Sequence, residues 1–149
     1  LVRIYLPAVK CLKKENPVTR FISPDQLKGN GERILVVEDQ KEMLDFVSLA
    51  LRKNGYTVFG AANAQEALDI FDREKGNIGL VFSDVVLPGQ TGIELVDKII
   101  SLKPDQKVVL TSGYMDEKSQ WPAIQQKGYR FLQKPYPINL LLAAIKENI

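Results

Sequence analysis

From residue 33 to the end of the chain, short apolar runs alternate with segments in which apolar residues recur every three or four positions. A short run predicts a buried strand and the longer spacing predicts an amphipathic helix, so the alternation is typical of βα units around a parallel sheet. The expected strands are Ile34–Val37, Tyr56–Phe59, Ile78–Ser83, Lys107–Leu110 and Tyr129–Leu132. We therefore expect an α/β fold with a doubly wound, five-stranded parallel sheet.

Four of the five segments that follow these strands have a clear helical pattern. Their apolar positions are Met43, Leu44, Val47, Ala50 and Leu51, then Ala64, Ala67, Leu68 and Phe71, then Ile93, Val96, Ile99 and Ile100, and finally Ile138, Leu141, Leu142 and Ile145. Asn63 is the expected N-cap of the second helix. The segment from Met115 to Lys127 is less regular and has Trp121-Pro122 in its middle, which predicts a short, broken or shifted helix.

Residues 1–32 differ in character from the rest of the chain. Leu1–Pro7 alternates apolar and polar positions and predicts a lone strand, whereas residues 8–32 contain prolines and glycines without a sustained period. Such a composition is typical of a linker. Four apolar residues of this linker could dock on the domain that we expect over residues 33–149 or on a neighbouring molecule: Val18, Phe21, Ile22 and Leu27. The first residue is Leu rather than Met, which indicates a fragment of a longer protein.

Charge and composition exclude several functions. Residues 1–32 hold six Lys and Arg against three Asp and Glu, and residues 33–149 hold fourteen against fifteen, so the basic pI of 8.6 gives the main domain no reason to bind nucleic acid. No apolar stretch approaches the ~20 residues of a membrane span, so we expect no membrane contact by this segment. A single cysteine suits the cytoplasm. The absence of histidine excludes histidine acid–base catalysis and a phosphohistidine carried by this segment.

Residues with useful chemistry follow the expected strands. The first strand is followed by Glu38-Asp39, the third by Asp84, the fourth by Thr111 and the fifth by Lys134. Parallel strands bring their C-terminal ends to one edge of the sheet, where such folds bind ligands. Carboxylates gathered there repel one another by ~4 kcal/mol per close pair, which a cation such as Mg²⁺ relieves. The pattern predicts Mg²⁺-assisted phosphoryl transfer onto a carboxylate.

Each of these residues also has an ordinary interpretation. Asp39 could be a helix N-cap, and Asp84 could be a strand-end or turn aspartate. Thr111 could be a β-branched strand residue, and Lys134 a solvated lysine. The loop Val85-Val86-Leu87-Pro88-Gly89 is apolar, however, where a simple turn would be polar. Ordinary roles at every successive strand end are an improbable coincidence, so we favour a common site.

Four stretches, ILVVEDQ, FSDVVLPGQTG, VVLTSGY and FLQKPY, resemble the receiver (response-regulator) domain, the phospho-acceptor of two-component signalling. The resemblance covers about residues 33–149. It implies a flavodoxin-like (βα)₅ fold with strand order 2-1-3-4-5, an order that members of this family exemplify. It also implies that this fragment receives a phosphoryl group and is not itself an enzyme.

The resemblance implies the residues that bind the metal and the phosphoryl group. Asp84 looks like the phosphorylated aspartate. Glu38 and Asp39 look like the acidic pair that binds Mg²⁺ or Mn²⁺ together with Asp84. The backbone carbonyl of Val86 would be a further protein ligand.

The same resemblance implies a conformational switch. Thr111 resembles the switch hydroxyl, Phe131 stands at the aromatic switch position, and Lys134 resembles the lysine that contacts phosphate. Pro135 is expected to follow a cis peptide bond. Movement of Thr111 toward the phosphate would alter the face formed by the fourth helix, fifth strand and fifth helix, through which a homodimer could form.

The run Arg3-Ile4-Tyr5-Leu6-Pro7 is similar to the last strand of the histidine-kinase ATPase domain. This similarity implies that the chain is the C-terminal receiver of a hybrid sensor histidine kinase, whose parent could be anchored in a membrane. The expected partner is a histidine-containing kinase or phosphotransfer domain.

Three alternatives stay open. An aspartyl-phosphate phosphatase would carry a second aspartate two residues after the nucleophile, where Val86 stands. A flavodoxin-type cofactor site would need a glycine- and hydroxyl-rich loop after the first strand, where Glu38-Asp39 would repel phosphate. A phosphorylation-independent pseudo-receiver would act only as a protein-interaction module, although no key residue is missing.

Overall fold

Five parallel strands form the sheet of this computed structural model, which describes residues 23–113 and 122–149. The strands are β1 (Arg33–Val37), β2 (Thr57–Ala61), β3 (Leu80–Asp84), β4 (Lys107–Ser112) and β5 (Arg130–Gln133). Their order in the sheet is β2-β1-β3-β4-β5, which confirms the predicted doubly wound, flavodoxin-like fold. The predicted strand Leu1–Pro7 lies outside the described residues.

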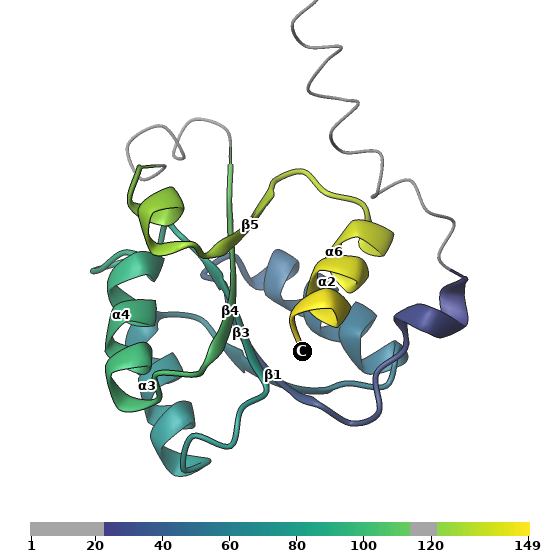
Figure 1. The fold of residues 1–149 in the computed structure, drawn as a ribbon, viewed down its shortest axis with the longest axis horizontal. Helices are drawn as coiled ribbons and strands as arrows, with labels where there is room; N and C mark the ends of the chain where they lie inside the picture. Colours follow the sequence, from purple (N-terminus) through teal and green to yellow (C-terminus); the bar gives the residue numbers. More distant parts are fainter. Residues whose placement is uncertain (1–22, 114–121) are drawn as a thin grey trace, which may run out of the picture.

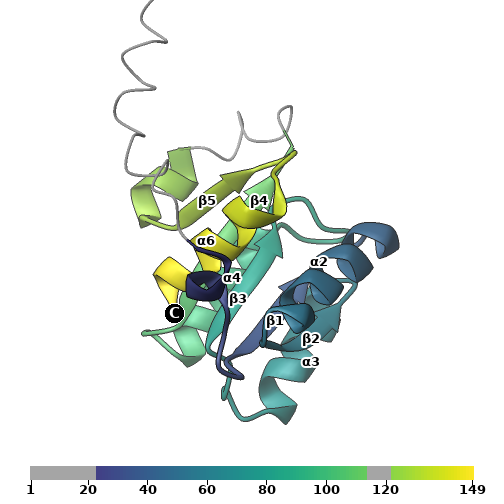
Figure 2. The same ribbon diagram turned by 90° about the vertical axis from the view of Figure 1, so that its right-hand side faces the viewer.

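Helices cover both faces of the sheet (Figures 1 and 2). They are α2 (Lys41–Lys53), α3 (Ala64–Arg73), α4 (Gly92–Leu102) and α6 (Ile138–Asn148). Residues 122–127 are also helical, whereas the first part of the irregular segment predicted over Met115–Lys127 lies outside the described residues. Among the described residues, no helix combines the length and the apolar character that a bilayer crossing requires.

The core divides into two clusters, one on each side of the sheet. The α3/α4 cluster includes Leu35, Phe71, Val81, Val96 and Leu110. The α2/α6 cluster includes Ile34, Val47, Phe82, Val109 and Ile145. Successive strand residues alternate between the clusters, and this burial on both sides explains why the strands are continuous apolar runs rather than alternating ones.

Local signals in the sequence fix both ends of α3 and the start of α4. The Asn63 side chain accepts a hydrogen bond from the Glu66 N–H at 2.8 Å, which confirms the predicted N-cap of α3. Thr91 and Glu94 form a reciprocal capping box at the start of α4. Beyond α3, Gly76 has a φ of +70°, a backbone conformation that glycine adopts without strain.

All five strands differ from the predicted ranges, by at most two residues at either end. β3 continues to Asp84 and β4 to Ser112, and the Val85 N–H extends the ladder by donating to the Thr111 carbonyl at 2.8 Å. β2 begins at Thr57 because the Tyr56 N–H instead donates to a carbonyl at the end of α2. The later ends of β3 and β4 place Asp84 and Thr111 inside the sheet rather than in the loops beyond it.

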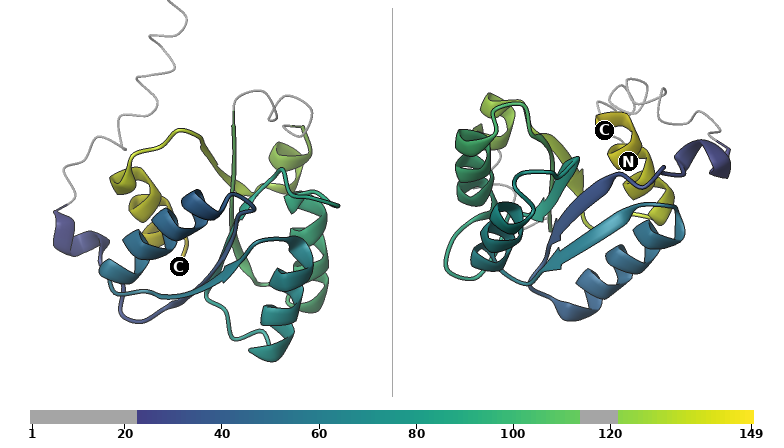
Figure 3. Two further views of the ribbon diagram at one scale, coloured as in Figure 1. Left: turned by 180° about the vertical axis from the view of Figure 1, so that it is seen from behind. Right: turned by 90° about the horizontal axis from the view of Figure 1, so that it is seen from below.

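The described part of the predicted linker, residues 23–32, packs against the domain, and we name it the N-terminal strap. Pro24–Leu27 forms one 3₁₀ turn, η2, beside α6 (Figure 3). Leu27 is only 7% exposed and belongs to the α2/α6 cluster. The Lys146 ammonium donates to the Lys28 carbonyl at 2.9 Å.

Two glycines allow the strap to approach the turn between α2 and β2. The Gly29 N–H donates to the Asn54 carbonyl at 2.6 Å, and the Gly31 N–H donates to the Gly55 carbonyl at 2.7 Å. A Cβ on Gly29 would overlap the Tyr56 ring, so this crossing requires glycine.

Replacing Leu27 with alanine tests the packing of the strap. We expect Leu27→Ala to lower the free energy of unfolding by about 2 kcal/mol, the low end for a buried leucine, because the site lies at the rim of the core. Urea unfolding followed by circular dichroism measures the effect. Asp25→Ala, at an exposed position of the same turn, should leave stability unchanged. Equal stability of Leu27→Ala and the parent protein would show that the strap does not pack in solution.

Candidate functional site

The residues predicted to share a site meet at the C-terminal edge of the sheet. Asp84 and Thr111 are register partners on β3 and β4. Val37 pairs with Ser83, so Glu38 follows β1 at the level where Asp84 ends β3. Lys134 follows β5 directly, and its backbone N–H donates to the Ser112 carbonyl at 2.9 Å. Four different strands therefore supply the site, which is why its residues are far apart in the sequence.

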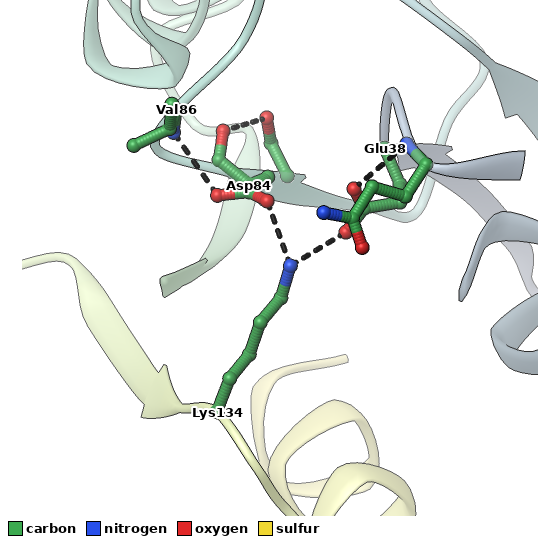
Figure 4. A network of polar contacts seen from close by, with 6 residues as sticks. Glu38, Asp84, Val86 and Lys134 are labelled. Carbon is green, nitrogen blue, oxygen red and sulfur yellow. Dashed lines mark hydrogen bonds and ion pairs between the residues drawn. The ribbon is translucent and has the colours of Figure 1, made fainter. Parts of the chain in front are cut away.

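The ammonium of Lys134 lies between two carboxylates (Figure 4). Its Nζ atom is 2.7 Å from Asp84 Oδ2 and 2.7 Å from Glu38 Oε2. Both acids are buried, with exposed fractions of 6% for Asp84 and 4% for Glu38. Charge-assisted hydrogen bonds of this length are among the strongest in proteins. The lysine thus compensates part of the negative charge that the strands bring together.

Burial and charge act in opposite directions on the pKa values of this group. Burial raises the pKa of Glu38 above its ordinary value, and hydrogen bonds from Lys134 and the Gln40 N–H offset this only in part. Burial also opposes the charge on Lys134, but its bonds to Asp84 and Glu38 outweigh burial and raise the pKa of the ammonium. Lys134 is therefore firmly protonated at neutral pH.

Three carboxylates form what we name the acid pocket: Glu38, Asp39 and Asp84. One oxygen from each lies within 4.8 Å of the others. At that separation each pair of charges repels by roughly 3.5 kcal/mol at an effective dielectric of about 20. A single lysine cannot balance three negative charges, and Asp39 is exposed, so the pocket is open to ions from solvent. Its oxygen donors match the ligand preference of Mg²⁺.

The backbone after Asp84 orients its carboxylate. The Val86 N–H donates to Asp84 Oδ1 at 3.0 Å, so each oxygen of this carboxylate has its own donor (Figure 4). The predicted role of the Val86 carbonyl as a metal ligand stays a prediction. The loop leaves the Val86 side chain 46% exposed beside the site.

Thr111 carries an unused hydrogen-bonding group at the site. The residue is 1% exposed, and its Oγ1 has no hydrogen-bond partner among the described residues. A buried hydroxyl without a partner costs about 1–3 kcal/mol, so a ligand oxygen nearby would be bound favourably.

Phe131 is partly buried and packs against the α3/α4 cluster, and it pairs in the sheet with Leu110, the residue before Thr111. Its role as an aromatic switch stays a prediction. The peptide bond between Lys134 and Pro135 is cis, as predicted.

Sequence reasoning missed Gly92, the first residue of α4. Its N–H donates to the Val85 carbonyl at 2.6 Å, and a Cβ at this position would overlap the backbone carbonyl oxygen of Asp84. Only glycine lets α4 begin this close to the end of β3. The available signal was a glycine inside a helical pattern, where alanine would be the stronger helix former.

The comparisons with known proteins agree with this geometry. A family model described as "Response regulator receiver domain" matches residues 34–146. The "Sensor kinase CckA" of Brucella abortus is 33% identical over 116 residues, which are 78% of this chain but 12% of that protein. The chain thus spans a small part of that kinase.

Two solved structures are similar over most of their length. The receiver domain from the hybrid histidine kinase CckA is 32% identical, with a TM-score of 0.65, over 78% of this chain and 97% of that one. The response regulator TrrA of Thermotoga maritima, solved in complex with Mg²⁺-BeF, is 28% identical, with a TM-score of 0.69, over 79% of this chain and 99% of that one.

Receiver domains are the phosphorylatable regulatory domains of two-component systems, and they interact with histidine kinases or phosphotransfer partners. They typically bind Mg²⁺, and the acid pocket offers oxygen ligands of the appropriate kind. The fold, the strand-end site and the family match all lead to one conclusion. This chain belongs to the response regulator receiver domain family.

Proposed function

We propose that this chain accepts a phosphoryl group from a phosphohistidine of a partner protein onto Asp84, with Mg²⁺ or Mn²⁺ bound in the acid pocket. The observation that carries the proposal is the position of the Asp84 carboxylate, 2.7 Å from the Lys134 ammonium and within 4.8 Å of the carboxylates of Glu38 and Asp39. A nucleophile, a fixed cation and a set of metal ligands are thereby combined at one point.

The donor set supports the metal part of the proposal. Glu38, Asp39 and Asp84 would hold the ion, with the Val86 carbonyl as a fourth protein ligand. A divalent ion bound there supplies positive charge that stabilises the phosphoryl oxygens during transfer. The TrrA structure, which contains Mg²⁺-BeF, is a precedent in a similar protein.

The transfer itself uses groups of this chain. An Asp84 carboxylate oxygen forms a bond to phosphorus while the P–N bond of the phosphohistidine breaks, and the electron pair of that bond stays with the imidazole. The product is an acyl phosphate. Lys134 would turn from the carboxylate to a phosphoryl oxygen, and the unpaired Thr111 hydroxyl would donate to another. Preorganised donors of this kind account for most of the catalysis in phosphoryl transfer.

Movement of Thr111 toward the phosphoryl group would couple phosphorylation to a change in conformation. Thr111 and Phe131 lie on neighbouring strands, so a shift of β4 changes the packing around Phe131. The surface affected contains β5 and α6, where a partner or a second copy of the chain could distinguish the two states. The similarity to CckA supports a place for this receiver in a hybrid sensor histidine kinase.

Phosphorylation with a small-molecule donor tests the proposal. With acetyl phosphate and Mg²⁺, we expect the intact mass to rise by one phosphoryl group, and we expect Asp84→Asn to abolish this gain. Asp45→Asn, at an exposed position on α2, is the matched control and should be labelled normally. A folded protein that gains no mass would instead be a pseudo-receiver that acts only through protein contacts.

Removing one predicted metal ligand tests the acid pocket. We expect Mg²⁺ at 100 times its dissociation constant to stabilise the parent protein by about 2.7 kcal/mol, measured by urea unfolding. Asp39→Asn should lose most of this increment with little change in metal-free stability, because the Asp39 side chain is exposed. Glu42→Gln removes an exposed charge three residues away and should keep the full response. An undiminished response in Asp39→Asn would exclude this residue as a ligand.

The compensating role of Lys134 gives a further prediction. Lys134→Met leaves two buried carboxylates without their ammonium, so we expect the metal-free protein to lose about 3 kcal/mol of stability. Because no lysine then competes for the carboxylates, Mg²⁺ should stabilise this variant more than it stabilises the parent. Lys127→Met, which breaks the more exposed pair with Asp97, should leave the Mg²⁺ increment unchanged. Equal increments in all three proteins would contradict the electrostatic argument.

A further inference from the structure

Tyr136 lies in the layer of side chains next to the acid pocket. It follows Lys134 by two residues, and its ring meets the Phe82 ring edge-to-face, with centroids 6.2 Å apart and an interplanar angle of 89°. Phe82 precedes Asp84 by two residues on β3, so the two share a face of the sheet. Phe82 is also the register partner of Val36, two residues before Glu38. The Tyr136 ring therefore packs on the β3 residue that lies two positions before Asp84, beside the β1 residue that lies two positions before Glu38.

The hydroxyl of Tyr136 is buried and has no hydrogen-bond partner among the described residues. A phenylalanine would fill the same space without burying an unsatisfied polar group, which is unfavourable. An unsatisfied buried donor calls for an explanation, and one explanation is a second state of the protein in which the donor is used.

The charges of the site act on this hydroxyl. Burial is the main reason that the pKa of Tyr136 rises to about 12, and the negative charges of Glu38 and Asp84 add to the increase, whereas Lys134 opposes it. The hydroxyl therefore keeps its proton at neutral pH and remains a donor. The three charged groups that act on it all belong to the candidate site.

Phosphorylation would leave one oxygen of Glu38 without its donor. In the unmodified protein, Glu38 Oε1 accepts from the Gln40 N–H at 3.1 Å and Oε2 accepts from Lys134 at 2.7 Å. When Lys134 turns toward the phosphoryl group, Oε2 loses this hydrogen bond, and a metal ion held by Glu38 would still leave a lone pair of the carboxylate free to accept another. Glu38 is 4% exposed, so water reaches the carboxylate poorly.

We infer that Tyr136 is a positioning residue whose hydroxyl donates to the Glu38 carboxylate once Lys134 has turned to the phosphoryl group on Asp84. The inference rests on the proposed function, because it needs the lysine to change partners. Within the described ranges, the hydroxyls of Thr111 and Ser112 are also buried without partners. Both belong to β4, and Thr111 is the register partner of Asp84 rather than a neighbour of Glu38. The Tyr136 ring, by contrast, reaches Phe82 on β3, the strand next to β1, and Glu38 is among the charges that act on its hydroxyl.

The variant Tyr136→Phe removes the hydroxyl and keeps the ring on Phe82. Beryllium fluoride with Mg²⁺ serves as the phosphoryl mimic, and its dissociation constant is measured by tyrosine and tryptophan fluorescence. We expect Tyr136→Phe to weaken binding about tenfold while its metal-free urea midpoint stays equal to or above that of the parent protein. Tyr129→Phe, which removes a hydroxyl that donates to Asp97 at 3.1 Å, is the matched control and should bind normally.

A spectroscopic measurement tests the inference on the parent protein itself. In protein labelled with ¹³C at the tyrosine Cζ position, the Tyr136 resonance should shift when beryllium fluoride is added, because the hydroxyl gains a carboxylate acceptor. The shift should be smaller in Glu38→Gln, which offers a neutral acceptor.

Equal affinities for the parent protein and Tyr136→Phe, or a Tyr136 resonance that does not move, would overturn the inference and leave the proposed function intact. A folded parent protein that binds no beryllium fluoride and gains no phosphoryl mass would overturn both.

Discussion

Mutual repulsion among three carboxylates at the end of the sheet is the constraint around which the site is organised. Strands β1 and β3 bring Glu38, Asp39 and Asp84 within 4.8 Å of one another, and two of the three are buried. Such a group is stable only with positive charge beside it. In the unmodified protein that charge is the Lys134 ammonium, delivered from the far side of the sheet by β5. A divalent ion and a phosphoryl group would redistribute the same contacts.

The surrounding fold serves this electrostatic balance. The two apolar clusters hold the strands in a register that aligns Asp84 with Thr111 and sets Glu38 beside them. Gly92 lets α4 approach the end of β3, which a side chain would prevent. The backbone N–H groups of Val86 and Gln40 donate to one oxygen of each buried acid, Asp84 Oδ1 and Glu38 Oε1. The other oxygens, Asp84 Oδ2 and Glu38 Oε2, both accept from Lys134. Of these three donors, only the lysine is a flexible side chain that can turn to another acceptor.

Periodicity and the residues at strand ends are sufficient to predict the fold class and the gathering of three carboxylates and Lys134 at one edge of the sheet, whereas the roles of these residues stay predictions. The sequence could not predict that Lys134 binds Glu38 and Asp84 together, since this depends on the path of a side chain across three strands. Gly92 escaped notice because its importance lies in the close approach of backbone atoms, which leaves no periodic signal. The sequence of the strap predicts a linker because glycines occur both in flexible linkers and where two backbone segments cross closely. Its packing depends on the shapes of Tyr56 and α6, which the sequence of the strap does not contain.

The packing of the strap also limits the distance that the domain can move away from residues earlier in the chain. An extended chain spans at most about 3.3–3.6 Å per residue, so ten residues held against the domain subtract roughly 35 Å from the reach of a flexible tether. A shorter tether raises the effective concentration of a partner on the same polypeptide, provided that the partner lies within range. Attachment of residues 23–32 to α6 and the α2–β2 turn would therefore favour a binding partner that is nearby over one that is distant.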